Sequence, residues 1–199
     1  MVGVAGVLDW LYREVDTELW IASLPLGLAL GYASLTEYPL PRSLPYALTL
    51  PLVLVLLALY ALGYLGGADA WLSLFLALAL PVPQGSLLPT LYLAFLYSAP
   101  FAVAYYLWEL YRFCGFSCMA GLKARVRGAD LAGKLKWWLP RGVRLVGDPH
   151  EVVAAEDLWD REVYASPLLP MVTLVFLGLL VAVLVGDTPV RIIVEALKR

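Results

Sequence analysis

The sequence has little charge, a single histidine and only two cysteines. Charged side chains make up 15% of its 199 residues, well below the roughly 25% of an average soluble domain. The cysteines, Cys114 and Cys118, and the one histidine are too few for a structural zinc site, which needs four ligands. We therefore expect no metal and no other cofactor. The net charge is only −2 and there is no basic tail, so nothing indicates nucleic-acid binding.

In place of charge the chain has apolar residues, which make up 62% of it. Several uncharged runs approach the roughly 20 residues that a helix needs to cross a bilayer core. We therefore predict an all-α fold, a polytopic bundle of about six transmembrane helices in the cell membrane. The predicted spans are residues 1–8, 19–35, 46–65, 69–82, 87–111 and 166–186.

The first of these spans is short. Residues 1–8 cannot cross a bilayer alone at about 1.5 Å per residue. Either Trp10, Leu11 and Tyr12 extend the helix, with their rings at the level of the headgroups, or the first helix is truncated. The residues themselves fit both interpretations.

The composition changes at residue 112. Residues 112–165 hold nine of the fourteen basic residues and several helix breakers, so we predict a small subdomain of helices and turns outside the membrane. The chain then divides into residues 1–111 with five membrane helices, residues 112–165, and residues 166–199 with the last helix and a tail. The nine basic residues are Arg112, Lys123, Arg125, Arg127, Lys134, Lys136, Arg141, Arg144 and Arg161.

This basic subdomain fixes the predicted orientation. Positively charged segments stay on the cytoplasmic side, so residues 112–165 are predicted to be cytoplasmic. Counting back through alternate spans makes the loops at 10–18 and 64–68 cytoplasmic as well. Asp9, which ends the first apolar stretch, and Asp69, which starts the fourth span, would then lie at one membrane depth. We expect them to face each other across the bundle.

Asp69 follows a turn of small residues, Gly66-Gly67-Ala68, between two uncharged stretches. A carboxylate at such a place costs about 3 kcal/mol on insertion scales and indicates a functional site. The glycines have no Cβ, so they allow a sharp turn and a close approach by a substrate strand. We therefore count residues 66–68 among the candidate substrate-binding residues.

Two acids in a partly dry site cannot both ionise easily, and they share one proton. In aspartic proteases such a pair activates water and protonates the scissile carbonyl. Asp9 and Asp69 are therefore our candidate catalytic pair. Two plainer interpretations remain open at this stage. Asp69 could cap the fourth helix, and Asp9 could pair with Arg13, four positions later.

The motifs resemble those of a known family. Residues 8–15 (LDWLYREV), followed by Trp20, are similar to the first-aspartate motif of the archaeal preflagellin and type IV prepilin peptidases. Residues 66–70 (GGADA) resemble the second motif, GxGD. The end of the chain is similar to the family's final span through Trp159, Pro167, Leu169, Pro170, Gly178, Gly186 and Asp187. The three motifs stand in family order.

This resemblance implies a membrane aspartic endopeptidase with Asp9 and Asp69 as its catalytic residues. Such an enzyme removes the basic leader from archaellin or type IV pilin-like precursors at the cytoplasmic face. The chain departs from GxGD at Ala68, which adds a Cβ beside the catalytic carboxylate. The paired CxxC motifs of the bacterial branch, whose members also methylate the new N-terminus, do not occur, so we expect no methyltransferase activity.

Further acids lie near the first motif. Glu14, Asp16 and Glu18 fall in the same predicted loop as Asp9, where they could attract a basic leader. An ordinary solvated loop explains them equally well. Glu109 near the end of the fifth span could tune the aspartate pair, but an ion pair with Arg112, three positions later, is the simpler prediction.

Two other functions compete with leader cleavage. One is a different GxGD-type intramembrane protease that clears signal peptides. The other is a transporter or assembly subunit in which the two aspartates bind a proton or cation. Transporters of this kind show paired repeats with broken helices, and we find no convincing repeat.

Overall fold

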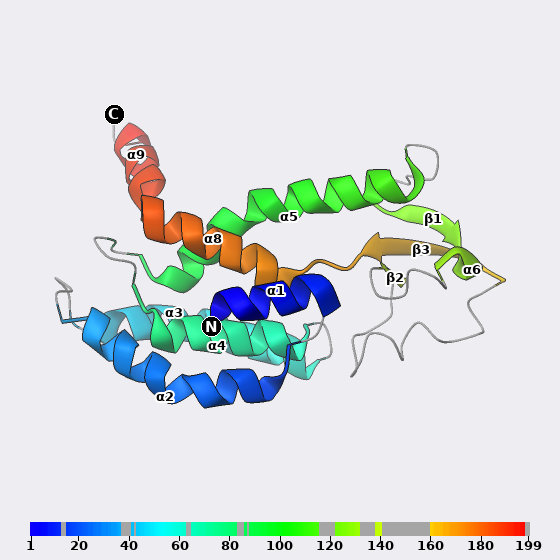
Figure 1. Cartoon of the computed structure of the whole chain (residues 1–199). Coiled ribbons are helices and arrows are strands. Elements are labelled where there is room, and N and C mark those ends of the chain that lie inside the picture. Colours follow the sequence, from blue (N-terminus) through cyan, green and yellow to red (C-terminus); the bar gives the residue numbers. More distant parts are fainter. Residues whose placement is uncertain are drawn as a thin grey trace. The chain divides into compact units, whose positions relative to one another are not determined.

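A computed structural model describes residues 1–12, 15–36, 41, 43–62, 65–82, 86, 88–115, 122–131, 138–140 and 160–197. It is mostly helical, with a small sheet (Figure 1). Contacts divide the chain into two compact units. The first unit joins Met1–Phe101 to Pro170–Arg199, and the second is Ala102–Leu169.

The first unit consists of helices. They are α1 (Val2–Tyr12), α2 (Thr17–Ser34), α3 (Ser43–Ala61), α4 (Gly67–Ala79), the first part of α5 (Thr90–Cys114), α8 (Met171–Val185) and α9 (Thr188–Leu197). Each of the six predicted spans overlaps one of the helices α1 to α5 and α8, with ends that differ by a few residues. The tail, predicted only as a short extension, forms the additional helix α9.

Proline and glycine set several helix ends. The backbone of Gly66 is extended, and α4 begins at the next residue. The helix stops before Pro81, because the residue that precedes a proline avoids the helical conformation. Pro170 occupies the N-cap position of α8, so the last span begins at Met171 and not at Ser166 as predicted.

Close helix packing forms the core of this unit. Helix α4 packs against α2 and α3, and α8 packs against α1 and α4. The rings of Trp20 on α2 and Phe75 on α4 are tilted, with centroids 5.7 Å apart. Gly31 lets α2 approach α4 closely, because a Cβ there would collide with the carbonyl oxygen of Leu78. Apolar side chains and small residues thus hold α4 at the centre of the unit.

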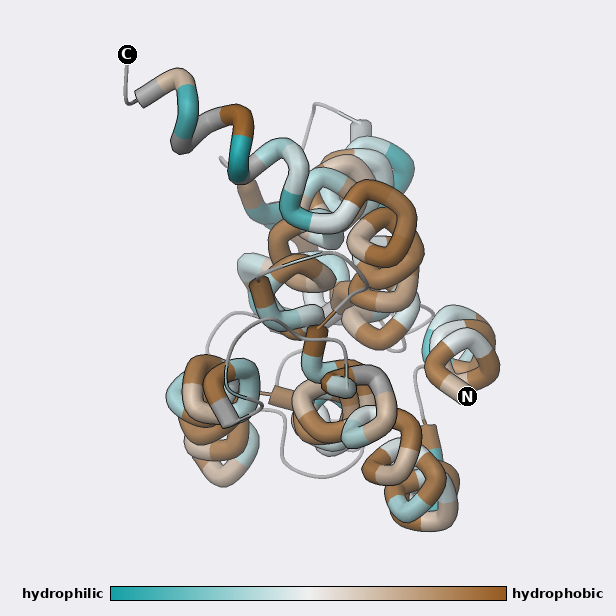
Figure 2. The backbone as a smooth tube through the Cα atoms, turned by 90° about the vertical axis from the view of Figure 1, so that its left-hand side faces the viewer, coloured by the Kyte–Doolittle hydropathy of each residue, from teal (hydrophilic) through white to brown (hydrophobic). Residues whose placement is uncertain are grey.

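The outward surfaces of the helices are also apolar. Leu26, Leu54, Val103 and Leu184 are more than half exposed, and in Figure 2 hydrophobic residues run around whole turns of several helices. Soluble proteins rarely expose large contiguous apolar patches. Two helices, Leu44–Ala61 and Thr90–Phe113, are long and apolar enough to cross a membrane. A count of six spans stays a prediction.

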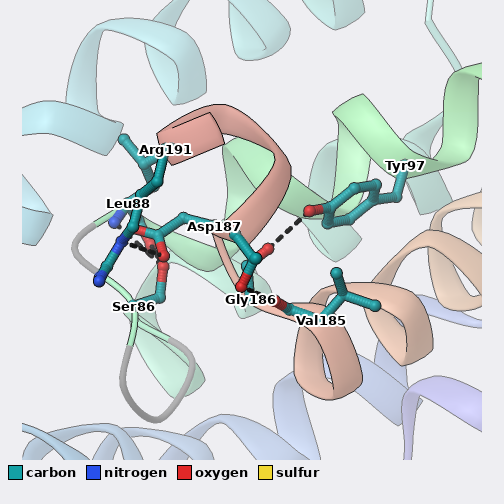
Figure 3. Close-up of polar contacts among 8 residues, drawn as sticks. Ser86, Leu88, Tyr97, Val185, Gly186, Asp187 and Arg191 are labelled. Carbon is teal, nitrogen blue, oxygen red and sulfur yellow. Dashed lines mark hydrogen bonds and ion pairs between the residues drawn. The ribbon is translucent and has the colours of Figure 1, made fainter. Parts of the chain in front are cut away.

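A polar corner joins α8 and α9 to α5 at Gly186 (Figure 3). The hydroxyl of Tyr97 on α5 donates to the carbonyl of Gly186 at 2.6 Å. Gly186 has a positive φ of 61°, which favours glycine. The next residue, Asp187, is buried and pairs with Arg191 on α9 at 2.8 Å. The Gly186-Asp187 motif therefore turns the chain from α8 into α9.

The second unit contains a three-stranded antiparallel sheet with the order β1-β3-β2. Its elements are β1 (Ala124–Arg127), the short α6 (Gly128–Leu131), β2 (Trp138–Pro140) and β3 (Glu162–Pro167). Ala124 pairs with Ala165, and both pack with Leu110 and Leu131 in a small core. The prediction of an all-α fold, with helices and turns in this segment, is therefore wrong for these strands.

Candidate active site

Asp69 is the third residue of α4 and lies in its first turn. Its backbone N–H donates to the carbonyl of Gly66 at 3.2 Å. The N-cap position is occupied by Gly66, and no side chain caps the helix. The prediction of a capping role for Asp69 is therefore wrong, and its carboxylate is available for another function.

The small-residue turn fits tightly around this carboxylate. A Cβ added to Gly66 would lie 3.4 Å from Oδ2 of Asp69, and one added to Gly67 would lie 3.6 Å from the ring of Tyr60. Ala68 packs against the apolar core. Its methyl group thus serves packing, and the glycines leave space beside Asp69.

Asp9 lies on α1, near the C-terminal end of the helix. It is buried, with 7% of its surface exposed. Its Oδ2 accepts a hydrogen bond from the backbone N–H of Thr173 at 3.0 Å, and the Thr173 hydroxyl lies 3.3 Å from the same oxygen. That hydroxyl also donates to the carbonyl of Gly6 at 2.6 Å. Thr173 therefore links α8 to α1 at Asp9. Arg13, the alternative partner, lies outside the described residues.

Asp9 on α1 and Asp69 on α4 belong to the same compact unit, and the charge of Asp9 acts on the Asp69 carboxyl group. Helix α8 contacts both α1 and α4, so it connects the two helices that carry the acids. Two nearby acids in an apolar bundle can hold one proton between them, which is the state that acid–base catalysis with water requires.

A cavity of about 60 Å³ lies against Asp69. Apolar side chains of α3, α4, α5 and α8 line most of it. Its polar members are Asp69 and Ser73, and the Ser73 hydroxyl donates to the carbonyl of Asp69 at 2.8 Å. Among the described residues, Asp69 is thus the only residue with an ionisable side chain that borders this apolar cavity.

The acids predicted to bind substrate lie at the start of α2. Asp16 is its N-cap residue without a side-chain hydrogen bond to the helix, and Glu18 is in the first turn. Both are exposed. Glu14 lies outside the described residues. The solvated position of Asp16 and Glu18 fits both interpretations of this loop.

Two further predictions concern ion pairs and metals. Glu109 pairs with Arg112 at 3.7 Å, which confirms the predicted contact. In the part of the chain that the structure describes, no group of three or more His, Cys, Asp and Glu residues could hold a metal ion.

Sequence reasoning missed Thr173 and the cavity residues on α5 and α8. Thr173 carries a hydroxyl in an otherwise apolar helix, one turn after Pro170. This is the only feature of the sequence that distinguishes it. The cavity residues are ordinary apolar side chains, and no pattern along the sequence distinguishes them from core residues.

Comparison with known protein families identifies the family of this chain. The model of the type IV leader peptidase family matches residues 1–107, more than half of the chain. The chain belongs to the type IV leader peptidase family. Its members are membrane-integral proteases, so this chain is a membrane protein of protease type. Neither the curated proteins nor the solved structures contain a match.

The match covers the part of the chain that carries both aspartates. It includes α1 with Asp9 and α4 with Asp69, and it ends within α5. Helix α8, with Thr173, lies beyond the matched residues. The leader peptidase family membership agrees with the resemblance found in the sequence.

Proposed function

We propose that this leader peptidase is an aspartic endopeptidase that removes the basic leader from archaellin or type IV pilin-like precursors at the cytoplasmic membrane face. The proposal is supported by the electrostatic interaction of Asp9 on α1 with Asp69 on α4, both within the first unit. These are the acids that the family resemblance assigns to catalysis.

The chemistry follows from one proton shared between two carboxylates. The ionised carboxylate takes a proton from water, and the water oxygen attacks the carbonyl carbon of the peptide bond. The protonated carboxylate donates to the carbonyl oxygen as the tetrahedral intermediate forms. The intermediate then collapses and the C–N bond breaks: the carboxyl group that took the water proton gives it to the leaving amine, and the other carboxylate takes back a proton from a hydroxyl of the intermediate. Because the proton moves between the acids, we assign the two roles to the pair as a whole.

The orientation of the site is inferred from charge. The nine basic residues between 112 and 165 are expected on the cytoplasmic side. Asp9 and Asp69 would then face the cytoplasm, where precursors carry their leaders before export. The exposed Asp16 and Glu18 lie close to Asp9 in the sequence. Their negative charge would attract a basic leader and increase the rate of encounter.

Two alternative functions can be distinguished from leader cleavage by testing which substrates the protein cuts. A GxGD-type protease that clears signal peptides would cut cleaved membrane stubs instead of intact precursors. A transporter or assembly subunit would cut neither. Membership in the leader peptidase family favours the precursor as substrate.

The decisive experiment is a cleavage assay in membranes with a pilin-type precursor. We expect Asp9→Asn and Asp69→Asn each to abolish the product, because neither variant has a complete acid pair. Asp130→Asn is the matched control, since Asp130 is an exposed acid on α6 in the second unit. Cleavage retained by either active-site variant, at normal levels of folded protein, contradicts the proposal.

A further inference from the structure

Helix α9 follows the corner at Gly186 and lies beyond the family-matched residues, and the proposed chemistry does not use it. We propose that α9 is an interfacial helix, which lies between the lipid headgroups and the acyl chains and binds the lipid surface through its apolar side. This interaction surface is at the end of α8 farthest from Thr173, and it does not depend on the protease function.

The sequence of α9 is amphipathic. At 3.6 residues per turn, Val190, Ile193 and Leu197 fall on one side of the helix. Arg191 and Glu195 fall on the opposite side, and both are exposed. A helix with such a pattern either buries its apolar side against other protein or lies in the plane of a membrane surface.

The direction of α9 fits a membrane surface. In the part of the chain that the structure describes, α9 is not among the helices that pack closely against another element. Figure 1 shows α9 running across the direction of α4 and α8, and in Figure 2 this C-terminal helix extends away from the bundle. Where bundle helices enter a membrane, a helix that runs across them lies along the membrane surface.

The end of α8 indicates that lipid reaches the start of α9. Val183 is 60% exposed, Leu184 84% and Val185 41%, and in a membrane protein such an apolar surface meets acyl chains. Helix α8 has 15 residues and is therefore about 22 Å long, which is less than the roughly 30 Å of a hydrocarbon core. We therefore expect the Gly186 corner at the edge of the hydrocarbon layer, and α9 begins two residues later.

The polar groups of the corner fit this depth, because charges and carbonyls near acyl chains are costly unless they are paired. Asp187 is buried and pairs with Arg191 at 2.8 Å. The carbonyl of Gly186 accepts the hydroxyl of Tyr97 at 2.6 Å (Figure 3). These contacts fix the first turn of α9 to the ends of α8 and α5. A lipid surface that binds α9 thereby also holds the end of α8 in place.

The test is a depth measurement on the full chain in phosphatidylcholine vesicles. Cys114 and Cys118 are replaced by serine, and Ile193→Cys or Glu195→Cys then carries an NBD fluorophore. We expect the label at position 193 to emit at shorter wavelength, to lose quenching by aqueous iodide, and to be quenched by lipids with a nitroxide near the headgroup end of the acyl chain. The label at position 195, on the opposite side of the same helix, should stay open to iodide and is the matched control.

Three results of this measurement overturn the inference. Equal quenching by iodide at both positions places α9 in water. Stronger quenching of position 193 by a nitroxide at the bilayer centre than by one near the headgroups places α9 inside the membrane. Protection from iodide that disappears when the protein is diluted into more lipid assigns the apolar side to a second copy of the chain.

A pair of variants tests whether the apolar side causes the binding. With the label on Leu197→Cys, Ile193→Asp should restore quenching by iodide, because a carboxylate is expelled from the acyl region. Ile192→Asp makes the same substitution one position earlier, at the edge of the polar side, where Ile192 is 60% exposed. This control should keep the label protected. Protection that survives Ile193→Asp overturns the inference, as does a lower melting temperature of that variant in detergent, which would show that the apolar side packs against protein.

Discussion

The backbone N–H of Thr173 donates to Oδ2 of Asp9 at 3.0 Å, and this bond joins α8 to α1 across 164 positions of the sequence. The hydroxyl of the same threonine lies 3.3 Å from that oxygen and donates to the carbonyl of Gly6 at 2.6 Å. Thr173 therefore holds both Asp9 and the preceding turn of α1. The carboxylate of Asp9 therefore cannot rotate freely, and its orientation depends on α8.

Replacing Thr173 by Val tests this positioning role. The variant keeps the backbone N–H and the shape but loses the hydroxyl and its bond to the carbonyl of Gly6, a neutral hydrogen bond of about 1 kcal/mol. We expect kcat to fall about fivefold, by the usual relation of rate to free energy, with little change in KM. Thr173→Ser should restore most of the rate, since it regains the hydroxyl. A Val variant with the kcat of the wild type contradicts the role.

The shared proton predicts a bell-shaped dependence of the cleavage rate on pH. At low pH both carboxylates are protonated and neither can take a proton from water. At high pH both are ionised and neither can protonate the carbonyl oxygen. Measuring kcat/KM across the pH range should therefore show two limbs that belong to the pair. A rate that rises with pH and then stays level argues that only one acid takes part.

The aspartate pair could be predicted from the sequence because its signal is local. Each acid interrupts or follows an uncharged stretch, and the predicted alternation of spans would set both at one depth. The contact between Asp9 and Thr173 gave no such signal. The contact depends on which faces of α1 and α8 meet. When a helix is apolar on all sides, the spacing of its apolar residues does not predict which face contacts a neighbouring helix.

The sheet of the second unit was missed for a different reason. Its strands are short, and β1 reads Ala-Arg-Val-Arg, which alternates small or apolar residues with basic ones. Such alternation is a strand signal. We interpreted the arginines only as evidence for a cytoplasmic location. In β3 the buried and exposed residues also alternate toward its end, where Ala165 faces the small core.

The acids that follow the first motif in the sequence predict a charge effect on substrate binding. Glu14→Lys, Asp16→Lys and Glu18→Lys together should raise KM for a precursor with a basic leader and reduce the salt dependence of kcat/KM, because electrostatic attraction is screened by salt. The values are to be measured at low and at high ionic strength. Asp130→Lys and Asp160→Lys, two exposed acids of the second unit, form the control. Unchanged kinetics in the triple variant would mean that these acids only solvate the loop.

Close packing of α8 on α5 predicts a stability effect at Gly178. A Cβ at this position would collide with the carbonyl oxygen of Ala94 and lie 2.7 Å from the backbone nitrogen of Ser98. Backbone atoms cannot rotate away as a side-chain end can, so Gly178→Ala must push the helices apart. We expect a loss of about 1–3 kcal/mol, the usual cost of overpacking, measured as a lower melting temperature of the solubilised protein. Gly3→Ala is the control, because its Cβ would meet only the ring of Phe176, at 3.2 Å, and a ring can shift. Equal melting temperatures for the two variants would show that α5 and α8 are not in close contact here.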